Sequence, residues 1–208
     1  TLQILNNNIS VVFYDVTTVY FEIDNEDELR KTGFSKEGKH QNPQIVLGLL
    51  VSKSGYPLAY EIFEGSKIEG HTMLPVVDAF KNKYNLSQLI IIADSGLLSN
   101  NNIEELQTKG YEFILGARIK NENKKIKEKI LALTLRNGES AIINKAGLKL
   151  IITYSDDRAK KDKYNREKGL RKLEKQIKRG RLTKASINNR GYNKFLKWNI
   201  NLSLVHYP

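Results

Sequence analysis

Two aspartates occupy positions where a carboxylate could do chemistry. Asp15 lies within the apolar and β-branched stretch Val11–Phe21, and Asp94 directly follows the apolar run Leu89–Ala93. A carboxylate within an apolar strand is costly unless it is paired or binds a metal ion. Functional groups of open α/β sheets gather at the carboxyl ends of strands. If the two strands are neighbours, both carboxylates can converge on one divalent cation, and hard oxygen ligands suit Mg²⁺ or Mn²⁺.

Each aspartate alone also has a structural interpretation. An Asp at the end of a strand often accepts hydrogen bonds from the amides of a turn, and Ser95-Gly96 after Asp94 fits such a turn. Asp15 alone could equally face solvent. The two together, on the first and fourth predicted strands, favour the metal site.

The elements that would position these residues follow from the hydrophobic pattern. Strands are predicted at 11–21, 45–51, 57–63, 89–93 and 113–115. One helix is predicted after a His71-Thr72 cap, through Phe80, and a second from a Ser99 cap through Leu106. The first three strands can pair antiparallel, and the helical crossovers place the fourth and fifth parallel. The predicted fold class is therefore α/β, an RNase H-like mixed sheet with helices.

The second half of the chain has a different character. Residues 1–115 hold 9 Lys/Arg and 15 Asp/Glu, whereas residues 116–208 hold 25 and 8, so the net charges are −6 and +17. Predicted elements are a basic helix at 120–135, a hairpin at 139–154 and a long charged helix at 157–179, and residues 194–208 show no clear organisation. The asymmetry suggests a polyanion partner. A lysine-rich solvated surface is the alternative.

The long charged helix carries the candidate DNA-binding residues. Its cations could track phosphates without reading bases, or they could form a solvated face with helical-spaced ion pairs. The candidates are Arg158, Lys160, Lys161, Lys163, Arg166, Arg171, Lys172 and Lys175.

Composition excludes several other classes of protein. The chain has no cysteine, so it has no disulfide, thiolate zinc site or cysteine nucleophile. Its longest apolar run, Ile45–Val51, is far shorter than the roughly 18–20 residues of a membrane span. The three histidines lack ligand spacing. The N-terminus has neither a signal-peptide pattern nor an initiator Met, so we expect a cytoplasmic chain that starts inside a longer protein.

Five segments between Asp15 and Arg118 or beside them form a recognisable set of motifs: Tyr14–Thr18, Pro43–Val51, Gly55–Gly65, His71–Pro75 and Ile92–Leu97. Through them, the segment from Asp15 to Arg118 resembles the catalytic core of bacterial insertion-sequence DDE transposases, in the group with a β-rich insertion before the third acid. The resemblance implies that Asp15 and Asp94 are the first two members of a metal-binding triad. It implies Mg²⁺- or Mn²⁺-dependent cleavage and joining of transposon-end and target DNA by a nucleoid-associated enzyme, with a second copy as a candidate partner.

The same resemblance gives the expected domains: a partial catalytic core at 1–118 and a basic insertion region at 119–208. The family's third acid is a Glu on a helix after the insertion, but the last acid here is Glu174. Asp162 and Glu167 are the remaining candidates for this third ligand. We expect instead that the chain is truncated near Trp198, before the third acid, and is catalytically inactive. The alternatives are a non-catalytic DNA-binding remnant of a transposase and an RNase H-like nuclease outside transposition.

Overall fold

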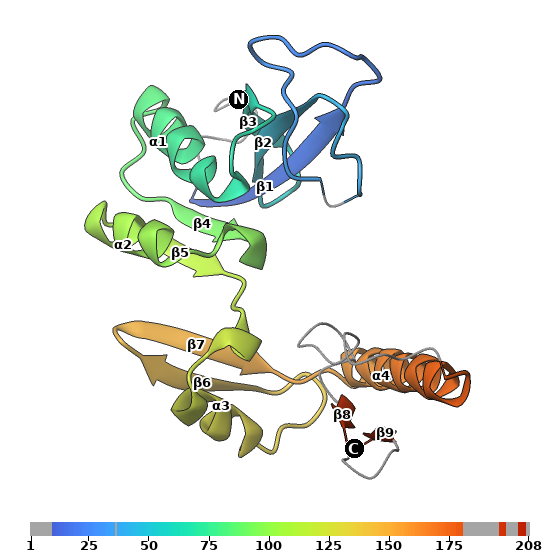
Figure 1. The fold of residues 1–208 in the computed structure, drawn as a ribbon. Coiled ribbons are helices and arrows are strands. Elements are labelled where there is room, and N and C mark those ends of the chain that lie inside the picture. Colours follow the sequence, from blue (N-terminus) through green and yellow to red (C-terminus); the bar gives the residue numbers. More distant parts are fainter. Residues whose placement is uncertain (1–9, 36, 181–195, 199–203, 207–208) are drawn as a thin grey trace. The chain divides into compact units, whose positions relative to one another are not determined.

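The computed structural model describes residues 10–35, 37–180, 196–198 and 204–206, and the chain divides into two compact units between Asn123 and Lys124 (Figure 1). Within the described residues, no helix combines the length and apolar character that a membrane crossing requires.

The first unit is built on a five-stranded mixed sheet. Its strand order is β3-β2-β1-β4-β5, in which β2 pairs antiparallel with β1 and β3, and β4 pairs parallel with β1 and β5. This order and these directions are those of an RNase H-like fold, so the predicted fold class is confirmed. The strands are β1 (Val11–Tyr20), β2 (Gln44–Ser52), β3 (Pro57–Glu64), β4 (Ile90–Ala93) and β5 (Glu112–Leu115).

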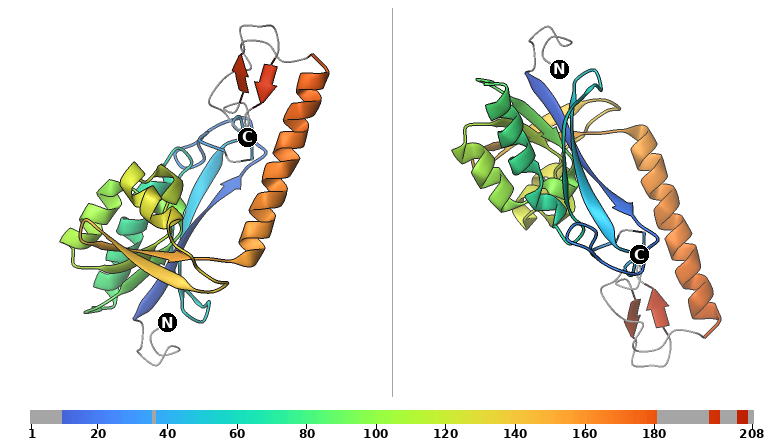
Figure 2. Two further views of the ribbon diagram at one scale, coloured as in Figure 1. Left: turned by 90° about the horizontal axis from the view of Figure 1, so that it is seen from below. Right: turned by 90° about the horizontal axis from the view of Figure 1, so that it is seen from above.

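Two helices cover one face of this sheet. α1 (Met73–Lys83) follows the 3-10 turn η1 (Glu69–His71), and α2 (Asn100–Thr108) follows the 3-10 turn η2 (Ser95–Leu97). Figure 2 shows both helices, in green, on the same side of the blue and cyan strands. Apolar side chains of both helices and of that face form one core, which includes Val12, Tyr14, Leu50, Met73, Val77, Phe80, Ile91 and Leu106.

The other face of the sheet is more exposed. Along β1 the side chains of Val12 and Tyr14 are 0% and 2% exposed, whereas Phe13 between them is 37% exposed. Strand alternation places Asp15 on the same face as Phe13, and Asp15 is exposed. Asp15 therefore faces solvent, which the sequence had left open, because the apolar residues of β1 divide between two faces and only one of them meets α1 and α2.

The start of α1 differs from the predicted cap. Thr72 is the N-cap residue, but its side chain makes no capping hydrogen bond. Its hydroxyl donates instead to the Glu69 carbonyl oxygen, at 2.7 Å. Because η1 runs directly into α1, the hydroxyl satisfies a carbonyl of the preceding turn rather than an amide of the helix. The predicted cap of α2 is correct, since the Ser99 hydroxyl accepts from the Asn102 amide.

The second unit contains α3 (Lys124–Leu131), the antiparallel hairpin of β6 (Ser140–Lys145) and β7 (Leu148–Thr153), and the 23-residue helix α4 (Asp156–Lys178). The hairpin turns through Ala146 and Gly147, both at positive φ, as a two-residue turn requires. Strands β8 (Leu196–Trp198) and β9 (Leu204–His206) pair antiparallel, an organisation that the sequence did not reveal.

The basic helix expected at 120–135 is shorter than predicted. The short 3-10 turn η3 (Ile119–Asn121) ends where Glu122 adopts an extended backbone, and α3 begins only after it. Asn121 and Asn123 are poor helix formers, which favours a break between η3 and α3.

Substitution of Gly48 by Ala tests the packing of β1 against β2. A Cβ atom at Gly48 would lie 2.1 Å from the Tyr14 hydroxyl oxygen and 3.0 Å from its Cζ atom. We expect Gly48→Ala to lower the free energy of unfolding by about 1–3 kcal/mol through overpacking, and Tyr14→Phe to recover part of this loss in the double variant. Urea denaturation followed by circular dichroism measures both effects, and equal stability of Gly48→Ala and the parent chain would contradict this packing.

Candidate metal centre

Asp15 and Asp94 occupy adjacent positions on neighbouring parallel strands. In the ladder between β1 and β4, Phe13 lies opposite Ile92 and Tyr14 lies opposite Ala93. Asp15 and Asp94 each follow by one residue, and Asp94 keeps an extended backbone with φ −74° and ψ 169°. Residues at equal positions of a parallel ladder point to the same face, and neighbouring strands lie about 5 Å apart. Both carboxylates therefore lie on the same face, Asp94 where β4 ends and Asp15 beside it on β1, which continues to Tyr20.

Each carboxylate has one oxygen engaged by a backbone amide. Asp15 Oδ1 accepts from the Val16 amide at 2.8 Å, and Asp94 Oδ1 accepts from the Gly96 amide. The structural interpretation of Asp94 as a turn residue is thus correct, and it is compatible with a second role. The Oδ2 atoms of both aspartates make no hydrogen bond to another described residue, so each aspartate retains an oxygen that can coordinate a cation.

The carboxylate oxygens of Asp15 and Asp94 are ligands of the type that hard divalent cations prefer. Mg²⁺ is commonly held by one or two carboxylates, with substrate phosphates and water completing its shell. Within the described residues, no three His, Cys, Asp or Glu side chains come together to hold an ion. The two aspartates therefore supply part of a coordination shell rather than a closed cage.

The turn that carries Asp94 is anchored from the core side. Leu97 is 3% exposed and belongs to the core. The side chain of Asn102, which is 2% exposed, donates to the Leu97 and Gly70 carbonyl oxygens, both at 2.8 Å. Asn102 therefore joins η2, which follows Asp94, to η1, which contains Glu69.

Glu69 is a carboxylate near Asp94 that the sequence did not single out. A Cβ atom built at Gly96 would lie 3.2 Å from Asp94 Oδ1 and 3.8 Å from Glu69 Oε2. The absence of a side chain at Gly96 therefore leaves room for both carboxylates on this side of the turn. The segments lie 25 residues apart in the chain, and no local spacing pattern connects them.

Tyr14 lies beneath the site, on the core face. Burial raises the pKa of its hydroxyl to about 12. The negative charges of Asp15 and Glu61 also raise this pKa, whereas the polar side chain of Thr72 partly lowers it. The hydroxyl meets hydrogen-bonding geometry with no other described residue. Tyr14 is therefore a neutral packing residue of the candidate site and supplies no charge to it.

Helix α4 separates its ion-paired cations from a row of unpaired lysines. Arg158, Lys160 and Arg171 pair with acids of the same helix at 3.9–4.0 Å. Lys161, Lys168, Lys172 and Lys175 make no ion pair with another described residue, and all four are exposed. With 3.6 residues per turn, these four lie within about 60° of one another around the helix axis. We call them the lysine stripe.

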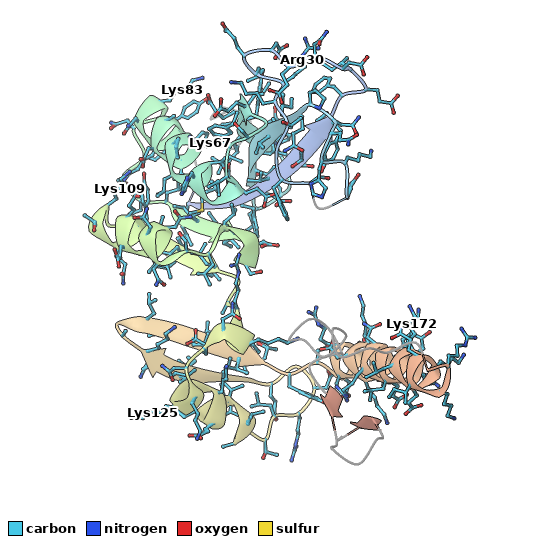
Figure 3. The ribbon with its side chains drawn as sticks, in the orientation of Figure 1. Arg30, Lys67, Lys83, Lys109, Lys125 and Lys172 are labelled. Carbon is cyan, nitrogen blue, oxygen red and sulfur yellow. The ribbon has the colours of Figure 1, made fainter. Side chains whose placement is uncertain are left out.

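The lysine stripe lies opposite the apolar side of α4. Helical spacing places Ala159, Leu170, Leu173 and Ile177 together on the far side, and Leu173 is 2% exposed. Lys172, labelled in Figure 3, projects from the helix. The stripe also includes Lys168, which the sequence prediction omitted, and whose ammonium lies 5.8 Å from the centre of the Tyr164 ring. Lys163 and Arg166 are exposed as well but lie outside the stripe.

The two remaining candidates for a third acid are also on α4. Asp162 pairs with Arg158 and Glu167 pairs with Arg171. Both acids thus serve helical-spaced ion pairs. The alternative interpretation of the helix predicted such pairs for Glu167 and Glu174, and of these two the structure shows a pair for Glu167. A third ligand stays a prediction. His71 is exposed in η1.

Comparison with known proteins identifies the family. The sequence profile of the transposase DDE domain matches residues 7–203, so the chain belongs to this family and its resemblance to DDE transposases is confirmed. Membership of this family implies the use of a divalent metal ion. No curated protein matches the chain.

Two solved structures are similar to the chain. One is the Mos1 transposase paired-end complex with left transposon end, with 15% identity, a TM-score of 0.35, and 50% of this chain and 34% of that chain covered. The other is the piggyBac transposase synaptic complex with hairpin DNA, with 12% identity, a TM-score of 0.44, and 71% and 31% covered. The chain thus spans about a third of the length of each.

Substitution of Asn102 tests the anchor of the Asp94 turn. Asn102→Ala removes one buried and one partly buried hydrogen bond to backbone carbonyl oxygens, and we expect a loss of about 1–3 kcal/mol in the free energy of unfolding. Asn101→Ala is the matched control, because Asn101 is exposed and its side chain bonds only to Glu105 of its own helix, and we expect a change within about 0.5 kcal/mol. Thermal denaturation compares the two variants, and equal losses would show that Asn102 is no anchor.

Proposed function

We propose that this chain contributes two metal-binding carboxylates, Asp15 and Asp94, to a DDE transposase that cleaves and joins DNA strands at insertion-sequence ends. The observation that carries the proposal is their adjacent placement on β1 and after β4, with one oxygen of each carboxylate left for a cation. Hard oxygen donors at this point favour Mg²⁺, and Mn²⁺ as its substitute.

The reaction is phosphoryl transfer at a DNA strand. The oxygen of water or of a 3′-hydroxyl forms a bond to phosphorus while the bond to the leaving oxygen breaks. A divalent ion held here would stabilise the negative charge that develops on these oxygens. Asp15 and Asp94 would hold that ion through their Oδ2 atoms, while the amides of Val16 and Gly96 hold the opposite oxygens in place. No covalent enzyme intermediate is required.

The DNA backbone would be held in part by α4. The lysine stripe runs from Lys161 to Lys175, 14 steps of the helix or about 21 Å along its axis, which is more than half a turn of B-form DNA. Its exposed ammonium groups are suited to phosphates and do not read base sequence. The ion-paired Arg158, Lys160 and Arg171 would contribute less, because each is already partly neutralised.

Two other functions predict different outcomes in one assay. A non-catalytic DNA-binding remnant would bind DNA with Mn²⁺ present and leave a supercoiled plasmid intact. A nuclease or a complete transposase site would nick or linearise the plasmid, and Asp15→Ala and Asp94→Ala would each abolish the cleavage. The proposed function assigns two ligands of the metal site to this chain. The plasmid assay tests whether a third ligand completes the site. A second copy of the chain stays a candidate partner.

Titration with Mn²⁺ tests the proposed metal site directly. We expect Asp15→Asn and Asp94→Asn each to weaken Mn²⁺ binding by at least about tenfold, because each removes a charged ligand. Asp24→Asn is the control, since Asp24 is an exposed carboxylate in the loop after β1. Isothermal titration calorimetry provides the affinities, and binding that survives both site substitutions would place the ion elsewhere.

The lysine stripe is tested by the salt dependence of DNA binding. Lys168→Gln, Lys172→Gln and Lys175→Gln together remove three stripe charges, and we expect the slope of log affinity against log salt to fall by roughly three. The matched triple variant Arg158→Gln, Lys160→Gln and Arg171→Gln removes three ion-paired charges, and its slope should change less. Fluorescence anisotropy with a labelled duplex measures both, and equal slopes for the two variants would refute a stripe.

A further inference from the structure

Arg118 makes two hydrogen bonds to the turn that carries Asp94. Its Nε atom donates to the Ser95 carbonyl oxygen at 2.9 Å, and its Nη2 atom donates to the Gly96 carbonyl oxygen at 3.2 Å. Arg118 is exposed and makes no ion pair with another described residue. The guanidinium is therefore engaged by two backbone carbonyls of the candidate site rather than by an acid.

The backbone before Arg118 also packs closely on this turn. The Gly116 amide donates to the Ala93 carbonyl oxygen at 3.0 Å, and a Cβ atom at Gly116 would lie 2.6 Å from the Ser95 nitrogen. The segment that leaves β5 thus passes directly against the first residue of the turn. This close approach brings Arg118 within reach of the two carbonyls.

The contacts of Arg118 lead to the Asp94 carboxylate through a single residue. The Gly96 amide donates to Asp94 Oδ1, and the Gly96 carbonyl accepts from Arg118. The residue that orients the carboxylate is therefore itself held on its solvent side, while Asn102 holds the next residue, Leu97, on the core side. Without Arg118, the carbonyls of Ser95 and Gly96 lose their side-chain donor and the turn has one anchor instead of two.

We propose that Arg118 is a positioning residue of the metal site, which fixes the orientation of Asp94 by binding the Ser95 and Gly96 carbonyl oxygens. This inference rests on the proposed function, because it assumes that Asp94 binds a divalent cation. Arg suits the role better than Lys, since its planar fork presents two donors at once to neighbouring acceptors.

The direction in which Mn²⁺ affinity changes on substitution of Arg118 distinguishes a positioning role from simple charge repulsion. A guanidinium close to a cation site repels the cation, so removal of its charge alone would tighten Mn²⁺ binding. Loss of an outer partner that orients a ligand has the opposite effect and commonly weakens metal affinity by roughly 10–100-fold. The proposal therefore predicts weaker binding from the removal of a positive charge.

The experiment measures Mn²⁺ affinity of the full chain by isothermal titration calorimetry for Arg118→Ala, Arg118→Met and Arg118→Lys. We expect Ala and Met to weaken binding by roughly tenfold, and Lys to recover part of the loss because it supplies one donor. Lys120→Ala is the matched control, since Lys120 is a nearby exposed cation without a hydrogen bond to the turn, and its affinity should stay unchanged or rise. Circular dichroism verifies that each variant keeps its secondary structure.

Hydrogen exchange of the Gly96 amide gives a second readout that needs no metal. In Arg118→Ala the amide should exchange faster than in the parent chain, because the turn opens more readily. Unchanged or tighter Mn²⁺ binding in Arg118→Ala, or an equal loss in Lys120→Ala, would overturn the role of Arg118. Absence of Mn²⁺ binding by the parent chain would overturn the proposed function instead, and the exchange rate of Gly96 would still show whether Arg118 holds the turn.

Discussion

The parallel pairing of β1 with β4 at the centre of the sheet is the constraint on which the candidate site depends. The crossover between them must carry the chain over one face, and α1 in that crossover supplies much of the core. Val12 of β1 and Ile91 of β4 are paired in this ladder and belong to the core, and both are 0% exposed. The register between β1 and β4 is therefore strongly determined. A slip of one residue would exchange the two faces of a strand, and it would separate Asp15 from Asp94.

Three glycines around the site matter as much as the side chains that line it. Gly48 leaves room for the Tyr14 ring under β1, Gly96 leaves room beside the Asp94 carboxylate, and Gly116 allows the end of β5 to approach Ser95. At each glycine, the space of a side chain is used by backbone or by a functional group of another residue. The site is therefore built from a rigid strand on one side and a closely packed turn on the other, a combination that holds ligands more precisely than a loop alone.

Much of the first unit could be predicted from the sequence, because strands and helices of this length leave clear apolar periodicity and the crossover rule then orders them. Asp15 and Asp94 were found because each has a local signal, a carboxylate in or after an apolar strand. Glu69 has no such signal, since its approach to Asp94 depends on packing between distant segments. On α4, the sequence prediction grouped eight cations together without distinction and omitted Lys168. Ion pairs and helix faces, which divide those cations, become visible only in three dimensions.

The most direct test of the central claim is a crystal of this chain soaked in Mn²⁺ and measured at a wavelength where manganese scatters anomalously. We expect an anomalous peak between the carboxylates of Asp15 and Asp94, within the roughly 2.0–2.6 Å that separates hard cations from their oxygen ligands. The same soak of an Asp94→Asn crystal should lose the peak. A manganese peak that contacts neither aspartate, or one that persists unchanged in the variant, would show that Asp15 and Asp94 do not form the metal site.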